Sequence, residues 1–297
     1  MADADIEAVR ARRATDPGAT LAAAADRQRR PLLDASGRLL LIAADHPARG
    51  ALGVRDDPLA MADRAGLLQR LLVALSRPGV DGVLGTADVL EDLLALGALE
   101  GKVVVGSMNR GGLRGASFEL DDRFTGYDAE TIEAMGFDGG KMLCRIALDD
   151  AATPATLESC GRAITDLARR GLVAMIEPFM SSRSGGSVTN HLDADAVILS
   201  VAVASGLGAR SASTWLKLPV VDEMERVMAA TTLPTLLLGG DPHGKADETY
   251  GRWERALALP GVRGLVVGRA LLYPHDGDVE AAVDTAARLV RPQLAAT

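Results

Sequence analysis

Short apolar runs alternate with helix-like stretches along most of the chain. Each run is followed by a polar loop and then by a stretch with helical periodicity. Parallel βα units produce this alternation, because every strand of such a sheet is buried beneath helices. Eight runs are predicted to be strands: Leu39–Ala43, Gly82–Leu84, Lys102–Val105, Lys141–Ile146, Val173–Ile176, Thr214–Leu216, Thr235–Leu238 and Leu265–Val267.

Two of the intervening stretches carry clear helix signals. Asp193 can cap a helix that ends near Gly206, and a second helix is predicted over 222–230. Apolar residues recur in both stretches at helical spacing, which predicts one buried face for each. The residues predicted to face inward are Val197, Val201 and Ala204 in the first helix and Met224, Val227 and Met228 in the second.

The eight alternating units predict an α/β fold, a (β/α)8 TIM barrel, as a single domain over 1–297. Residues 1–36 form its N-terminal helical extension, in which Asp16-Pro17-Gly18 separates two short helices that we expect to cap the barrel bottom. The competing fold is a doubly wound open sheet. A Gly-x-Gly-x-x-Gly signature would then follow the first strand, and it does not, so the barrel is favoured.

Composition narrows the class of protein. The chain has 297 residues, near the length of about 250 that a barrel typically needs. Its formal charge of −8 argues against a nucleic-acid partner, and no apolar run approaches the ~20 residues of a membrane span. The N-terminus lacks the apolar core of a signal peptide, so a cytoplasmic protein with no membrane partner is predicted. We also expect a homo-oligomer.

Polar residues at the predicted strand ends are the candidates for chemistry. Catalytic groups of such barrels gather at the C-terminal ends of the strands. The first run ends in Asp45-His46, the fourth carries Lys141, the fifth ends in Glu177 and the sixth ends in Lys217. The predicted catalytic residues are therefore Lys217, Glu177, Lys141 and Asp45.

Lys217 is predicted to form a Schiff base with a carbonyl substrate. It follows Trp215 and Leu216 in an apolar strand, and desolvation together with a nearby cation such as Lys141 lowers the pKa of a lysine. The neutral amine is the form that attacks carbonyls. The alternative is a buried ion pair between one lysine and Glu177 that does no chemistry.

The two carboxylates are predicted to handle protons. Glu177 can shuttle protons, because a carboxyl group in a partly apolar pocket can be tuned toward neutral pH. Its alternative is to act only as the partner of a lysine. Asp45 can orient the lysine or take the proton of a substrate hydroxyl, and the alternative is that it only caps the following loop.

No metal site and no cofactor are predicted. The four histidines, at 46, 191, 243 and 275, are scattered, and none has the spacing of a strong metal motif. Asp45-His46 could still approach Asp241-Pro242-His243 and hold a divalent ion, which is the alternative to a Schiff base. Cys144 and Cys160 are too few for a disulfide framework and are predicted to be buried thiols.

An anionic substrate group is predicted to bind after the last two strands. Gly239 and Gly240 follow the seventh run, and Gly268 and Arg269 follow the eighth, where many barrels bind phosphate through backbone N–H groups. The alternative is ordinary turn chemistry. The loops Ser181–Ser187 and Asn109–Gly112 can close over a substrate, add anion contacts or simply lie on the surface.

The ordered strand-end residues resemble the class I aldolase superfamily of bacterial fructose-bisphosphate, tagatose-bisphosphate and sulfofructose-phosphate aldolases. The resemblance implies that Lys217 forms the Schiff base, that Glu177 assists proton transfer and that Lys141 contacts a small phosphorylated carbonyl substrate. The chain departs from the pattern at Gly126-Tyr127 and in its Ser/Gly loop. The matching segments are Asp45, Gly139–Leu143, Ile176–Pro178, Trp215–Lys217, Leu238–Gly240 and Gly268–Ala270.

The segment Ala43–Pro47 also resembles the barrel proteins of inositol breakdown. This narrower resemblance implies a lyase that splits 2-deoxy-5-keto-gluconate 6-phosphate into dihydroxyacetone phosphate and malonate semialdehyde. The alternatives are an aldolase for fructose or tagatose bisphosphate or for sulfofructose phosphate, and a barrel that transfers an acyl group or binds a phosphosugar without aldol cleavage.

Overall fold

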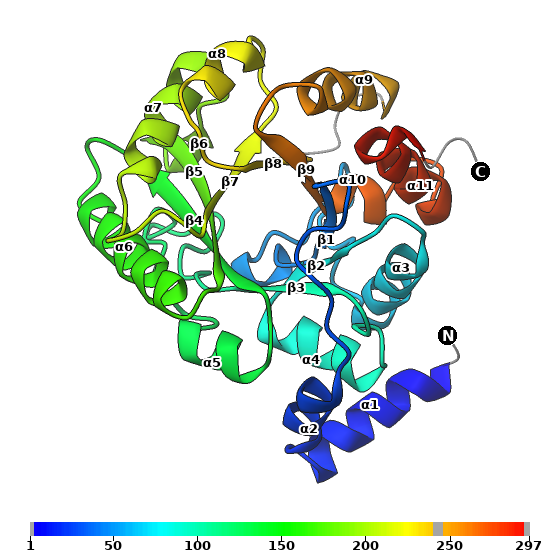
Figure 1. Cartoon of the computed structure of the whole chain (residues 1–297). Coiled ribbons are helices and arrows are strands. Elements are labelled where there is room, and N and C mark those ends of the chain that lie inside the picture. Colours follow the sequence, from blue (N-terminus) through cyan, green and yellow to red (C-terminus); the bar gives the residue numbers. More distant parts are fainter. Residues whose placement is uncertain (1–2, 240–245, 294–297) are drawn as a thin grey trace.

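Eight parallel strands close into a barrel in the computed structural model, which describes residues 3–239 and 246–293 (Figure 1). Their order around the barrel is β4-β3-β2-β1-β9-β8-β7-β5, and pairing of β4 with β5 closes it. Each predicted run overlaps one of these strands, so the (β/α)8 TIM barrel is confirmed. The strands are β1 (Leu39–Ala43), β2 (Gly82–Gly85), β3 (Val103–Ser107), β4 (Gly139–Ile146), β5 (Val173–Ser184), β7 (Thr214–Pro219), β8 (Thr235–Leu238) and β9 (Val262–Val267).

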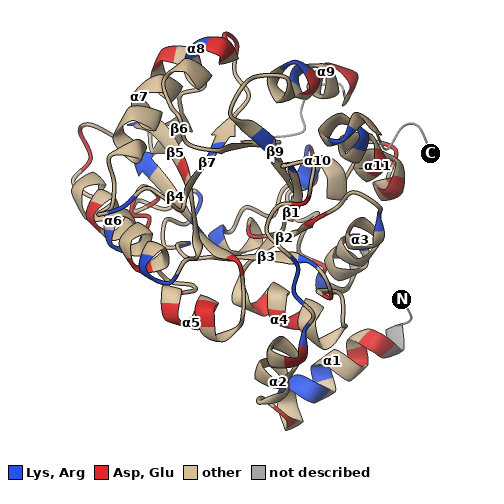
Figure 2. Cartoon of the chain, viewed as in Figure 1, with Lys and Arg blue, Asp and Glu red and all other residues tan. Residues whose placement is uncertain are grey.

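Helices surround the barrel as an outer ring. The predicted cap of α7 is confirmed, because the Asp193 side chain accepts a hydrogen bond from the Ala196 N–H. In Figure 2, many of the charged residues lie along these outer helices. No helix in the described part of the chain is long and apolar enough to cross a membrane. The elements are η1 (Pro47–Arg49), α3 (Arg64–Ser76), α4 (Ala87–Ala95), α5 (Ala129–Ala134), α6 (Thr153–Arg169), α7 (Ala194–Ser205), α8 (Met224–Ala229), α9 (Ala246–Leu257), α10 (Arg269–Leu272) and α11 (Val279–Val290).

The predicted Ser/Gly loop is a β-hairpin. Strand β5 continues to Ser184 and pairs antiparallel with β6 (Ser187–Asn190). Gly185 and Gly186 form the two-residue turn, both with positive φ (57° and 85°), as this type of hairpin turn requires. The segment therefore extends a barrel strand and is not an irregular surface loop.

Two N-terminal helices precede the barrel, α1 (Asp3–Thr15) and α2 (Ala19–Asp26), as predicted. They lie beside α4, where Arg13 donates to Asp92 over 2.7 Å, and do not cap the barrel bottom (Figure 1). The connecting segment 27–38 passes across the N-terminal ends of the strands instead. Its Leu32 and Leu33 pack against the apolar cluster inside the barrel.

The barrel interior has an apolar lower part and a polar upper part. The apolar part includes Leu39, Leu41, Ala43, Leu84, Val103, Val105, Met175, Trp215, Leu236 and Val266. Side chains along a strand alternate between its two faces, so a residue two positions farther along points to the same side. Such positions beyond the apolar part hold the buried polar residues Asp45, Ser107, Lys141, Glu177 and Lys217.

Candidate active site

Lys217 lies near the C-terminal end of β7 and is buried, with 3% of its side chain exposed. Its Nζ donates to Oε1 of Glu177 over 2.7 Å. Burial lowers the pKa of Lys217; the Glu177 carboxylate opposes this, and the cations of Arg110 and Arg269 lower the pKa further. The amine is therefore easier to deprotonate than an ordinary lysine amine, which favours its role as a nucleophile.

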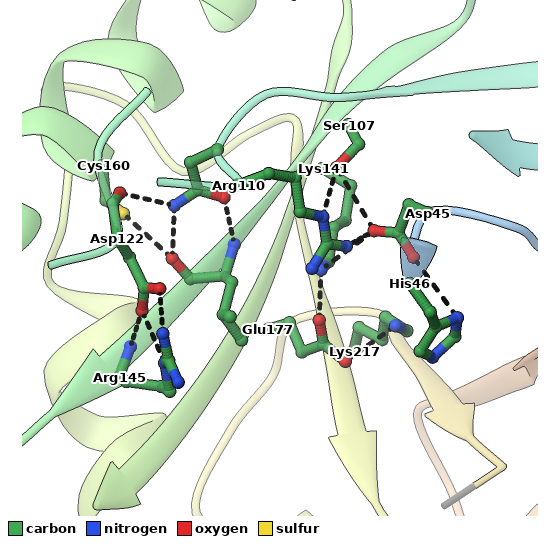
Figure 3. A network of polar contacts seen from close by, with 12 residues as sticks. Asp45, His46, Ser107, Arg110, Asp122, Lys141, Arg145, Cys160, Glu177 and Lys217 are labelled. Atoms are coloured by element: carbon green, nitrogen blue, oxygen red, sulfur yellow. Dashed lines mark hydrogen bonds and ion pairs between the residues drawn. The ribbon is translucent and has the colours of Figure 1, made fainter. Parts of the chain in front are cut away.

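Glu177 bridges both buried lysines (Figure 3). One of its oxygens contacts Lys217, and the other contacts Lys141. Burial alone would raise the pKa of Glu177, but the two ammonium groups hold it well below its usual range. Glu177 is thus ionised at neutral pH, and the prediction that its pKa is tuned toward neutrality is wrong.

Lys141 lies below the surface of the site. It is fully buried, and its Nζ is 3.4 Å from Oδ2 of Asp45. Burial lowers its pKa well below the usual range, and the nearby Arg110 adds to this effect. Among the described residues, the lining of the central cavity includes Lys217 and does not include Lys141. A bound molecule in that cavity therefore meets Lys217 first.

Asp45 points into the barrel from the end of β1. Its Oδ2 accepts a hydrogen bond from the Ser107 hydroxyl over 3.2 Å and also pairs with Lys141 and Arg110. In the described part of the chain, neither of its oxygens accepts a hydrogen bond from a backbone N–H of the next loop. The alternative that Asp45 only caps this loop is therefore wrong, and its carboxylate belongs to the charged network.

Arg110 joins the network from the loop after β3; the sequence named this loop, Asn109–Gly112, but did not predict Arg110 as a site residue. It pairs with Asp45 and donates from Nε to the Ser107 hydroxyl over 3.1 Å. Burial lowers the pKa of Arg110 to about 10, which still leaves a cation at neutral pH. The side chain of the preceding Asn109 both donates to and accepts from the backbone of Leu143. These two hydrogen bonds hold the start of the loop against β4, and this fixes the direction in which Arg110 points.

His46 follows Asp45 on the cavity wall. Its Nδ1 is 3.9 Å from Oδ1 of Asp45. Burial and the nearby cations of Arg269 and Lys217 lower the pKa of His46 well below its usual range, so the imidazole is neutral at physiological pH. Asp241 and His243, the other half of the alternative metal site, lie outside the described residues. Within the described ranges, no group of three potential metal ligands occurs.

The predicted phosphate-binding residues gather on one wall of the cavity. Gly239, Gly268 and Arg269 line it, whereas Gly240 lies outside the described residues. A Cβ added at Gly268 would lie 2.3 Å from the carbonyl oxygen of Ala43, so only glycine permits this approach of the chain to β1. The backbone at Gly268 is therefore held where Arg269 begins α10 and faces the cavity.

The cavity has a volume of about 570 Å³ and lies at the C-terminal mouth of the barrel. This volume falls within the range of small-molecule sites, roughly 300–1,000 Å³. Val188 and Asn190 of the β5–β6 hairpin form part of its wall. Although the whole chain is acidic, arginines dominate the charged lining of this cavity: Arg49, Arg110, Arg114, Arg145, Arg252 and Arg269.

A sequence model of the Cgl0159-like family matches residues 37–287. The solved structure of Cgl0159 from Corynebacterium glutamicum is 57% identical, covers 99% of both chains and superposes with a TM-score of 0.97. No curated protein matches the chain.

Structures of fructose-bisphosphate aldolases share the fold at low identity. An archaeal fructose-1,6-bisphosphate aldolase, solved with its catalytic lysine covalently bound to the carbinolamine intermediate of the substrate, is 19% identical over 86% of this chain and 94% of its own, with a TM-score of 0.66. The enzyme from Slackia heliotrinireducens is 16% identical over 94% of this chain and 92% of its own, with a TM-score of 0.61. The likeness shows a shared barrel.

Proposed function

The chain belongs to the Cgl0159-like family, and we propose that it is a class I aldolase in which Lys217 forms a Schiff base with a phosphorylated keto sugar or keto sugar acid. One observation carries this proposal. Both buried lysines that share Glu177 have a lowered pKa, and of the two it is Lys217 that lines the cavity. The catalytic lysine named for the archaeal aldolase structure adds support from a protein with the same fold.

In the proposed reaction, the neutral amine of Lys217 attacks the substrate ketone and gives a carbinolamine. Loss of water produces an iminium ion. A base removes the proton from the hydroxyl group on the carbon β to the iminium carbon. The oxygen of that group becomes the aldehyde carbonyl, and the electrons of the broken carbon–carbon bond move into the iminium. Protonation of the enamine and hydrolysis release the second product and restore the amine.

The charged network supplies groups for these proton transfers. Glu177 is ionised and hydrogen-bonded to Lys217, so it can accept the ammonium proton when the amine becomes a nucleophile. Asp45 is the second base in the proposal, and its Oδ1 lies on the side of His46. Lys141 holds both carboxylates in place from below through its contacts with Asp45 and Glu177.

The substrate phosphate is assigned to the wall formed by Gly239, Gly268 and Arg269. Close backbone approach at the glycines and a guanidinium are the groups that bind phosphate in such barrels. Our best candidate substrate is 2-deoxy-5-keto-gluconate 6-phosphate, cleaved to dihydroxyacetone phosphate and malonate semialdehyde. Fructose or tagatose bisphosphate and sulfofructose phosphate are the alternatives. A cytoplasmic homo-oligomer remains part of the proposal.

Borohydride reduction in the presence of dihydroxyacetone phosphate tests the proposal. Mass spectrometry should find a covalent adduct on Lys217 in the wild-type protein and none in Lys217→Arg. The arginine keeps a cation beside Glu177 but cannot form a Schiff base, so this variant separates chemistry from folding. Full lyase activity in Lys217→Arg or Lys217→Ala, or an adduct on Lys141 alone, would rule the proposal out.

A barrel that transfers acyl groups or binds phosphosugars without cleavage gives a different result. Incubation with the candidate phosphorylated substrates would then yield no dihydroxyacetone phosphate in a coupled assay. Sensitivity to a chelator would instead favour the metal-dependent alternative.

A further inference from the structure

His46 is a cavity residue to which the proposed reaction gives no role. It follows Asp45 after β1, lines the cavity and has 26% of its side chain exposed. No hydrogen bond joins its ring to a residue in the described ranges, and Nδ1 is buried without a partner. A buried polar atom without a hydrogen bond is costly to keep. Because Nδ1 is buried, Nε2 is the polar atom of the ring that faces the cavity.

Two contacts hold the imidazole at the barrel mouth. The carbonyl oxygen of His46 accepts a hydrogen bond from the Arg49 N–H over 3.1 Å, which fixes the backbone at the start of η1. A Cβ added at Gly268 would lie 3.1 Å from Cε1 of His46, so the ring packs against the backbone of that glycine. His46 therefore lies beside the wall to which the substrate phosphate is assigned.

The Asp45 carboxylate faces the cavity through His46. Its Oδ2 is already occupied by one hydroxyl group and two cations, those of Ser107, Lys141 and Arg110. Its Oδ1 accepts no hydrogen bond from the described residues and is 3.9 Å from Nδ1 of His46 (Figure 3). This distance is about 1 Å longer than a hydrogen bond. Such contacts between catalytic groups often shorten when the substrate binds.

The Asp45 carboxylate also determines which ring nitrogen of His46 carries the proton. Burial is the main cause that lowers the pKa of His46 well below its usual range, so the ring is neutral and has one N–H. An ionised carboxylate only accepts hydrogen bonds, so this N–H is favoured on Nδ1 and leaves a lone pair on Nε2. The charged groups that face His46 from the surrounding elements are Asp45, Lys141, Glu177, Lys217 and Arg269.

We propose that Nε2 of His46 is the base that removes the proton of the substrate hydroxyl, with Asp45 orienting the ring through Nδ1. The inference rests on the proposed function and deepens it. The O–H bond breaks and an N–H bond forms at Nε2, while the electron pair left on oxygen forms the aldehyde carbonyl as the carbon–carbon bond breaks. The Asp45 carboxylate stabilises the imidazolium, which gives its proton to water after the aldehyde has left. Glu177 remains the acceptor of the Lys217 proton.

Nitrogen NMR of the histidine-labelled protein tests this arrangement without any substrate. The signals of His46 are assigned by their loss in His46→Gln. At neutral pH they should show a ring that is protonated at Nδ1 and unprotonated at Nε2. An imidazolium, or a neutral ring protonated at Nε2, would overturn the inference, because no lone pair would then face the cavity.

Separate assays of Schiff-base formation and of cleavage test the role of His46 in the reaction. His46→Gln keeps a polar group near the place of Nε2 but cannot take up a proton. It should form the borohydride adduct with dihydroxyacetone phosphate, and exchange the hydroxymethyl hydrogen of that compound with heavy water, as the wild type does. Its kcat for cleavage should fall at least about 100-fold with little change in KM. The substrate is 2-deoxy-5-keto-gluconate 6-phosphate or fructose 1,6-bisphosphate, whichever the wild type cleaves.

Added imidazole distinguishes a missing base from a damaged site. His46→Ala should regain part of its cleavage rate in proportion to the concentration of neutral imidazole. His275→Gln is the matched control, because His275 is exposed and lies outside the cavity lining, and it should cleave as the wild type does. A wild-type kcat in His46→Gln, an equal loss of exchange and cleavage, or no rescue would overturn the role of His46. Absence of any wild-type adduct would instead contradict the aldolase itself.

Discussion

The lower and upper parts of the barrel interior are built from the same strands but differ in chemistry. Below, Leu41, Val105 and Met175 pack in an apolar cluster. On β5, Glu177 lies two residues after Met175 and points to the same side of the strand. On β7, Lys217 lies two residues after Trp215 in the same manner. Both parts are buried, so burial alone does not distinguish the framework from the candidate site.

The side chains of the two parts are stabilised in different ways. An apolar side chain in the lower part is stabilised by contacts that many neighbours share, and its loss leaves a cavity. A charged side chain in the upper part depends on one or two partners, and removing one leaves another charge buried without compensation. The following variants test this difference, beginning with the largest expected effect.

Glu177→Gln should destabilise the fold most, because it leaves Lys141 and Lys217 without their shared carboxylate. We expect the free energy of unfolding to fall by about 3–5 kcal/mol, measured by urea denaturation. Lys141→Met in the same chain should recover part of this loss, since it removes one of the two uncompensated charges. A loss below about 1 kcal/mol in Glu177→Gln would show that the network does not depend on the bridging carboxylate.

Leu41→Ala should lower the free energy of unfolding by about 3 kcal/mol through a cavity in the apolar part. The fraction of folded protein that forms the borohydride adduct with dihydroxyacetone phosphate should stay at the wild-type value, because no contact of Lys217 is removed. Loss of the adduct in a folded Leu41→Ala variant would mean that the two parts are coupled.

Lys141→Met should lower the free energy of unfolding by about 1–3 kcal/mol, less than Glu177→Gln, because Glu177 keeps Lys217 and Asp45 keeps Arg110 as partners. Glu177 would then pair with Lys217 alone, and this would raise the pKa of Lys217. Adduct formation at neutral pH should slow by about tenfold, the equivalent of one pKa unit. Faster adduct formation would show that Lys141 does not share the carboxylate in solution.

Arg110→Gln should have the smallest effect, a shift in pH dependence. Arg110 is one of the cations that lower the pKa of Lys217, so its removal raises that pKa. The neutral amine accumulates as the pH rises through the pKa, and the rising limb of the adduct-formation rate should therefore move to higher pH, by less than about one unit. Stopped-flow trapping across the pH range measures this limb, and a shift to lower pH would contradict the assignment.

The barrel was predictable because its strands are largely buried on both faces and contain short apolar runs, such as Leu39–Ala43 and Thr235–Leu238. The hairpin of β5 and β6 was not, since Ser181–Ser187 has the composition of a loop. Its pairing depends on the register of Ser181 with Asn190, which a pattern of small polar residues specifies weakly.

The candidate residues were predictable as strand ends, but their electrostatics were not. Glu177 and Lys217 follow predicted runs and Lys141 lies within one, yet only the closed barrel shows that both lysines reach one carboxylate. That contact reverses the expected direction of the Glu177 pKa. Arg49 ends the three-residue helix η1 and Arg110 lies in a loop, and neither segment has a periodicity that indicates the direction of a side chain, so their place in the cavity wall could not be inferred.

The 2.7 Å contact between Lys217 and Glu177 has a consequence for the energetics of the proposed reaction. An ammonium and an iminium carry the same charge at nearly the same place. The carboxylate that compensates the resting lysine is therefore already oriented toward the intermediate, and the site needs little dipolar reorganisation to stabilise it. Water would have to turn its dipoles for the same purpose at every turnover.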